Sequence, residues 1–95
     1  MTDEFLDRQK AVVHRLILDY RGGRLNLNSL IQRIEGVSNA VGSDAWKNAV
    51  FPIVVAMEQV NAFAIDAKRS LTAEDKEAIE KSLHDLEKFL EDFQG

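Results

Sequence analysis

The chain has no cysteine, a single proline and only five glycines among its 95 residues. Without cysteine it can form no disulfide, and no zinc or iron–sulfur site that is built on thiolates. Hydrophobic residues make up 45% of the chain and charged residues 29%, which is typical of a folded globular protein and unlike a disordered one. A chain of this length is expected to form a single domain, residues 1–95, which the patterns below predict to be helical.

Long hydrophobic runs are also missing. The longest uncharged stretch runs from Asn48 to Met57 and contains Pro52, so it is shorter than the roughly 20 apolar residues of a membrane span. The first residues are acidic, whereas a secretion signal starts with basic residues. We therefore expect a cytoplasmic protein that has no membrane partner.

The charge is distributed unevenly along the chain. The formal net charge is −4, and it divides into +1 for residues 1–70 and −5 for residues 71–95. Such a concentration of negative charge repels phosphate, so nucleic acid is not an expected partner, whereas a basic protein is. The alternative interpretation is a solvated helix face that keeps the protein soluble. The acids of the last segment are Glu74, Asp75, Glu77, Glu80, Asp85, Glu87, Glu91 and Asp92.

Apolar residues recur at spacings of three and four over most of the chain, which predicts amphipathic helices. The first helix is expected to end at Gly22-Gly23 and the second at Gly42, because glycine adopts the left-handed conformation readily. Polar residues that commonly cap helices precede the apolar stripes. The expected caps are Thr2, Asn28, Ser43 and Thr72, and an extended connection is expected to carry Leu25 and Leu27.

The third helix has two unusual features. Pro52 lies inside it, so the helix either kinks there or divides into two. Residues 53–67 are apolar nearly all round, which predicts a central core helix. The fold class is therefore all-α, an antiparallel helical bundle of four main helices, or of five if the third is split at Pro52. Gly36 in the second helix marks either a close approach of two helices or a neutral replacement.

Several polar residues and one aromatic residue stand out in or near the third helix. Glu58, Asn61 and Asp66 interrupt its apolar sequence, and a buried carboxylate there would have to be paired, protonated or turned outward. We favour an ordinary hydrogen bond or a polar edge over a functional role, with Arg15, Arg33 and Lys47 as candidate partners for Glu58. For the single tryptophan, Trp46, we favour a core position over an exposed interface anchor.

No pattern in the chain indicates catalysis. His14 and His84 lie in different helices with no serine beside either, and Gly22-Gly23 is not followed by the lysine of a phosphate-binding loop. Glu80, His84 and Glu87 share a helix face, but His84 does not follow a glutamate by three residues, as helical di-iron sites require. We therefore predict no enzyme activity, no cofactor and no metal site.

Five segments together resemble small all-helical bacterial proteins that are encoded beside polymorphic toxins, in particular immunity proteins of contact-dependent growth inhibition systems. The first segment is Asp19-Tyr20-Arg21-Gly22-Gly23, at the end of the first expected helix. The remaining four are residues 27–35, Trp46, residues 57–62 and Leu71-Thr72-Ala73-Glu74-Asp75.

The resemblance implies a cytoplasmic, non-enzymatic protein that binds a cognate toxin domain and masks its active site. Toxin domains that cut nucleic acid tend to be basic, so an acidic inhibitor would be steered to them. We predict that the partner-binding residues are Glu74, Asp75, Glu77, Glu80, Asp85 and Glu87. The alternative function is a helical adaptor, or a structural or regulatory module that forms homo-oligomers through leftover apolar surface.

Overall fold

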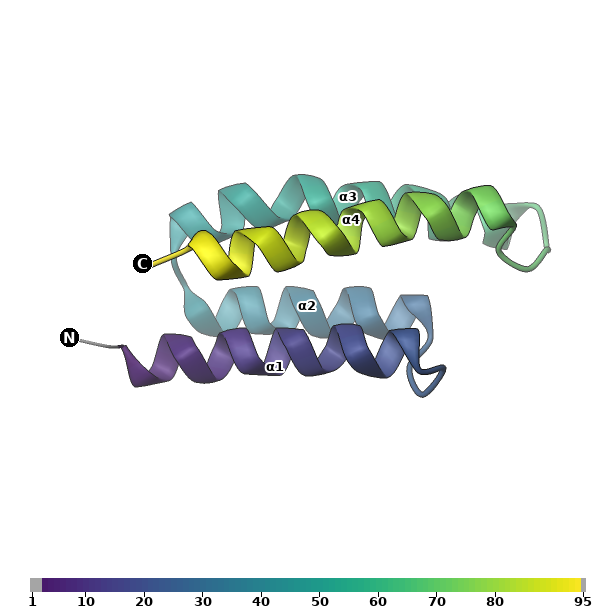
Figure 1. Cartoon of the computed structure of the whole chain (residues 1–95). Coiled ribbons are helices and arrows are strands. Elements are labelled where there is room, and N and C mark those ends of the chain that lie inside the picture. Colours follow the sequence, from purple (N-terminus) through teal and green to yellow (C-terminus); the bar gives the residue numbers. More distant parts are fainter. Residues whose placement is uncertain (1–2, 95) are drawn as a thin grey trace.

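The computed structural model describes residues 3–94, and the regular secondary structure of this range is entirely helical. The helices are α1 (Glu4–Arg21), α2 (Leu27–Val41), α3 (Asp44–Asp66) and α4 (Ala73–Asp92). Each helix packs against the next along the chain, with α1 and α2 forming one pair and α3 and α4 the other (Figure 1). The all-α class is confirmed, and the contacts are consistent with the bundle that the sequence predicts.

Hydrogen bonds between near neighbours determine where α1 begins and ends. The carboxylate of Asp3 accepts a hydrogen bond from the amide of Leu6 at 3.1 Å, so Asp3 is the N-cap. The predicted cap, Thr2, lies outside the described residues. Gly22 closes the helix and Gly23 has a φ of 78°, so the glycine pair ends the helix as predicted.

The predicted start of α2 is wrong by two residues. Asn26, not Asn28, is the N-cap, and its side chain accepts a hydrogen bond from the amide of Ser29 at 2.8 Å. Leu27 is therefore the first residue of α2 and not part of an extended connection. Entering the helix here places the buried Leu27 on the same face as Leu30, three residues later, which favours the earlier start.

The other predicted caps are confirmed. Ser43 accepts a hydrogen bond from the amide of Trp46, and Gly42 ends α2 in the left-handed conformation. Thr72 and Asp75 form a capping box, in which each side chain accepts from the other residue's amide, at 3.1 and 2.9 Å. These local bonds set the end of α2 and the starts of α3 and α4.

The core is built around Trp46. Its side chain is fully buried, and its indole N–H donates to the hydroxyl of the buried Ser38 at 2.9 Å. The rings of Phe89 and Phe93 meet it edge-on, with centroids 5.2 and 5.5 Å away. The favoured interpretation of Trp46 as a core residue is confirmed.

Helix α3 is continuous through Pro52, so the chain has four helices in the described range and not five. The prediction of a core helix at residues 53–67 is wrong. Val54, Met57 and Ala64 are buried, but Phe63 and Ile65 are 68% and 62% exposed. Helix α3 is covered on one side by α2 and α4, and its other side faces solvent.

Gly36 lies at an exposed position of α2. A methyl group added there would meet no other atom within 4 Å. The interpretation of Gly36 as a close approach of two helices is therefore wrong, and no packing requirement explains this glycine.

Candidate protein-binding surfaces

The six acids predicted to bind a partner all lie on α4, but their surroundings differ. Asp75 is half-buried and belongs to the capping box at the start of the helix. Its carboxylate also accepts a hydrogen bond from the guanidinium of Arg69 at 2.5 Å. The Arg69 hydrogen bond, together with that from the Thr72 amide, lowers the pKa of Asp75 below its usual value.

Glu80 and Glu87 are joined by an arginine from another helix. Arg21, at the end of α1, donates through Nε to Glu80 at 2.8 Å and through both terminal nitrogens to Glu87 at 2.8 and 3.1 Å. The Arg21 hydrogen bonds lower the pKa of Glu87, and the two carboxylates raise the pKa of Arg21. These carboxylates therefore hold α1 to α4.

The other three acids, Glu74, Glu77 and Asp85, are exposed. They share the solvent side of α4 with the basic residues Lys81 and Lys88, which are also exposed. The predicted acidic surface is thus divided into three residues with internal ionic partners and three that face solvent. Whether these six acids bind a partner stays a prediction.

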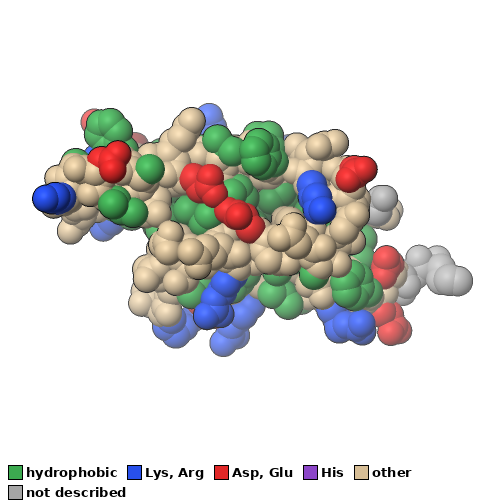
Figure 2. All heavy atoms as spheres, turned by 180° about the vertical axis from the view of Figure 1, so that it is seen from behind, with side chains coloured by type: hydrophobic (Ala, Val, Ile, Leu, Met, Phe, Trp, Pro, Cys, Tyr) green, Lys and Arg blue, Asp and Glu red, His purple; other side chains and the backbone are tan. Residues whose placement is uncertain are grey.

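A second surface lies on the solvent side of α3, which we call the α3 outer face. Phe51 and Phe63 are each 68% exposed there, an unusual position for large aromatic side chains. In the view from behind, where α2 and α3 are nearest the reader, hydrophobic side chains gather around two adjacent acidic ones (Figure 2). The exposed or half-exposed apolar residues of this face are Phe51, Pro52, Val55, Ala56, Ala62, Phe63 and Ile65.

By length and composition alone, α3 is apolar enough to cross a membrane. However, it supplies the fully buried Trp46 and Met57 to the core that α2 and α4 share. Only 22% of the most apolar stretch of α3 is buried within the molecule, so much of its apolar surface lies on the α3 outer face. An exposed apolar helix face of this kind is typical of a protein–protein contact.

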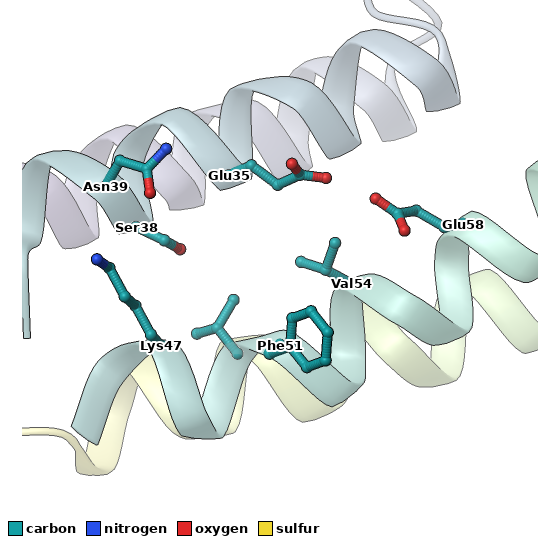
Figure 3. Close-up of a pocket in the computed structure, with 8 residues that line it drawn as sticks. Glu35, Ser38, Asn39, Lys47, Phe51, Val54 and Glu58 are labelled. Atoms are coloured by element: carbon teal, nitrogen blue, oxygen red, sulfur yellow. The ribbon is translucent and has the colours of Figure 1, made fainter. Parts of the chain in front are cut away.

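A groove of about 230 Å³ runs between α2 and α3 beside this face. Val50, Phe51 and Val54 supply its apolar part, while Glu35, Ser38, Asn39, Lys47 and Glu58 line the remainder. Figure 3 shows Glu35 from α2 and Glu58 from α3 pointing toward one another, with Lys47 farther along the groove. The groove therefore combines an apolar floor with two carboxylates and one ammonium group.

The two carboxylates influence each other. A hydrogen bond that protonated Glu35 donates to Glu58 raises the pKa of Glu35, and partial burial and repulsion by the charge of Glu58 raise it further. Both side chains are exposed, so Glu58 is turned outward and not buried in a core helix. Of the three partners considered for Glu58, Lys47 lines the same groove, and Arg15 and Arg33 do not.

The two remaining polar residues of α3 have structural surroundings. Asn61 is half-buried, and its amide donates to Asn28 of α2 at 3.4 Å, which agrees with an ordinary hydrogen bond. Asp66 is exposed at the end of the helix. Within residues 3–94, no group of three histidines, cysteines or acids could hold a metal ion.

Comparison of the chain with protein-family models, with curated proteins and with solved structures finds no match.

Two features of these surfaces escaped the sequence analysis. The first is the exposure of Phe51 and Phe63, although the sequence carries a signal for it. Trp46, Val50 and Met57 form one apolar stripe, and Phe51, Val55 and Ala62 form another on a different face of the same helix. The second is Glu35, whose proximity to Glu58 results from the packing of α2 against α3 and leaves no local pattern.

Proposed function

We propose that this chain is a non-enzymatic protein-binding module. The observation that carries the proposal is the α3 outer face, where large apolar side chains face solvent beside a groove that contains charged groups. Exposed apolar surface of this kind is retained in folded proteins mainly where a partner covers it. An antiparallel four-helix bundle supplies the rigid scaffold on which this face is presented.

The more specific proposal is that the partner is a basic bacterial toxin domain, and that binding masks its active site. The resemblance to immunity proteins of contact-dependent growth inhibition systems supports this, as does the net charge of −5 over residues 71–95. Glu74, Glu77 and Asp85 face solvent and carry no internal ion pair within the described part of the chain. We propose these three as the steering residues, acting in the cytoplasm without nucleic acid or membrane.

The test uses the protein domain that is encoded directly upstream of this chain. Coexpression should restore growth to cells that make the C-terminal domain of that neighbour, and the purified pair should form a complex. Replacing Glu74, Glu77 and Asp85 by glutamine or asparagine should slow association about tenfold and flatten its salt dependence. Unchanged association would remove these acids from the binding surface, and the absence of any complex would contradict the toxin proposal.

The second candidate function is a module that assembles from copies of this chain. The exposure of Phe51, Phe63 and Ile65 favours it, because these side chains need no basic partner to be buried. Sedimentation of the purified protein alone separates the two candidates.

A further inference from the structure

We infer that the α3 outer face binds the same face of a second copy, with the two α3 helices antiparallel about a twofold axis near Pro52 and Ile53. Lys47 of each copy then meets Glu58 and Glu35 of the other. This inference develops the second candidate function and does not depend on a toxin partner.

The positions of the charges lead to this arrangement. Lys47 and Glu58 are eleven residues apart, which is close to three helical turns, so both lie on the same side of α3. A twofold axis midway between them places each lysine opposite the other copy's glutamate and forms two equivalent ion pairs. A parallel arrangement would instead place Lys47 against Lys47 and Glu58 against Glu58.

The carboxylate pair gives a second reason for a cation at this place. Glu35 and Glu58 point toward one another across the groove, and in the isolated chain their charges repel (Figure 3). Lys47 lines the same groove but makes no ion pair within residues 3–94. In the antiparallel pair, the ammonium group of one copy would lie against both carboxylates of the other. Each carboxylate pair would then have a positive charge beside it, which offsets the repulsion between Glu35 and Glu58.

The same register also buries one of the large apolar residues, Phe51. Phe51 lies opposite Val54 of the second copy, because Phe51 follows Lys47 by four residues and Val54 precedes Glu58 by four. Val54 and Val50 form the apolar part of the groove, so each Phe51 can enter the groove of the other chain. A ring that is 68% exposed in the single chain thereby becomes the central contact, where aromatic anchors contribute most to binding.

The experiment is analytical ultracentrifugation of the full chain together with three charge variants. The unchanged protein should sediment as a dimer at micromolar concentration. K47E and E58K should each weaken dimerisation about tenfold or more, because each places like charges opposite one another twice. The double variant K47E/E58K should regain much of the dimerisation, because each of the two contacts between positions 47 and 58 again joins an acid and a base.

Mixing the two single variants gives the sharpest result. A K47E chain paired with an E58K chain has an acid opposite a base at both contacts, so the mixture should dimerise although neither variant does so alone. A matched control is K81E, which reverses a lysine on the solvent side of α4 and should leave dimerisation unchanged. Helical circular dichroism of each variant establishes that the exposed substitutions leave the fold intact.

Three outcomes would overturn the inference. One is an unchanged chain that remains monomeric up to millimolar concentration. Another is a mixture of K47E and E58K that sediments as monomers. The third is dimerisation that persists in F51S, because the proposed register has Phe51 at its centre. A monomer that still binds a toxin domain would reject this interface and leave the first candidate function standing.

Discussion

Glu35 and Glu58 show how the packing of two helices can change the pKa of an exposed residue. Neither carboxylate is unusual by itself, but the packing of α2 against α3 makes them face one another. The contact raises the pKa of Glu35, so the folded chain holds this proton more tightly than the unfolded chain does. The contribution of Glu35 to stability therefore decreases as the pH rises through its pKa in the folded protein.

Replacing Glu35 by glutamine should stabilise the dilute protein at neutral pH. The variant removes the repulsion between two charges, which is worth about 0.5 kcal/mol at an exposed site. At acid pH, where Glu35 holds its proton in the folded chain, the repulsion is lost and the gain should disappear. Urea unfolding at pH 7 and pH 3 measures the difference, and Glu77→Gln, which removes an isolated carboxylate on α4, should show no such gain. A gain of equal size at both pH values would contradict the explanation by charge.

The hydroxyl of Ser38 matters because it is the acceptor for the buried indole of Trp46. Ser38→Ala would leave a buried N–H without a partner, at a cost of about 1–3 kcal/mol in the free energy of unfolding. Ser82 is equally buried, at 8% exposure, but no side-chain hydrogen bond joins it to another described residue. Ser82→Ala is thus a matched control with a smaller expected loss. Equal losses in urea unfolding would show that the indole bond contributes nothing.

At the scale of the element, α3 shows that a segment can be helical along its whole length although only one of its sides is buried. Its helix continues through Pro52 from Asp44 to Asp66, capped by Ser43 at the start. Pro52 is exposed, so its ring disturbs no packing, but it removes one internal hydrogen bond of the helix. Helix formation here is therefore maintained against a local penalty by the packing of Trp46, Val50, Val54 and Met57 on the other side.

Pro52→Ala should raise the free energy of unfolding by about 1–3 kcal/mol, because alanine restores the missing backbone donor and has the highest helix propensity. Thermal and urea unfolding measure the gain. Ala56→Pro, one turn later at another exposed position of α3, is the opposite control and should cost about 3 kcal/mol. A loss of stability in Pro52→Ala would mean that the proline ring makes a contact which the isolated chain needs.

At the scale of the whole molecule, the weakest junction is between the first and last helices. Helix α1 touches α4 at few points, whereas every other neighbouring pair packs closely along the elongated molecule, whose extents are 48 × 25 × 19 Å. Arg21 bridges this junction at one end through Glu80 and Glu87. Near the other end, the ammonium group of Lys10 donates to the carbonyl of Phe93. These polar contacts thus hold α1 to α4, where few residues of the two helices pack against each other.

Arg21→Ala should loosen α1 from α4 and lower the free energy of unfolding by about 1 kcal/mol at pH 7. Arg21 lowers the pKa of Glu87 in the folded chain, so this stabilisation is complete above the unfolded value and is lost as the pH falls through the folded one. The difference between the variant and the unchanged chain should therefore shrink at acid pH. Hydrogen exchange of the α1 amides, together with urea unfolding, measures both effects.

Arg24→Ala is the control for this prediction. Arg24 follows α1 and pairs with Asp19 in the last part of that helix, not with α4. Its removal should therefore leave hydrogen exchange of the α1 amides nearly unchanged. If both arginine variants accelerate exchange equally, the bridge to Glu80 and Glu87 is not what holds the junction.

The sequence by itself indicated four main helices, with a division at Pro52 left open, and it located most of their ends and favoured the core position of Trp46. These features depend on residues within about four positions of one another: apolar spacing, a capping side chain at Ser43 or Thr72, and a glycine such as Gly42 after the last turn. The start of α2 was predicted two residues late because two asparagines can cap it. The burial of Leu27 is what selects Asn26.

Only the tertiary structure decided which side of each helix is covered. Helix α3 is apolar on two sides, but within residues 3–94 the other helices pack against only one of them, so Phe51 and Phe63 remain in solvent. The same packing brought Glu35 to Glu58 and Arg21 to Glu80. These contacts join residues at least 23 positions apart, and no local pattern contains them, because they arise when helix faces meet.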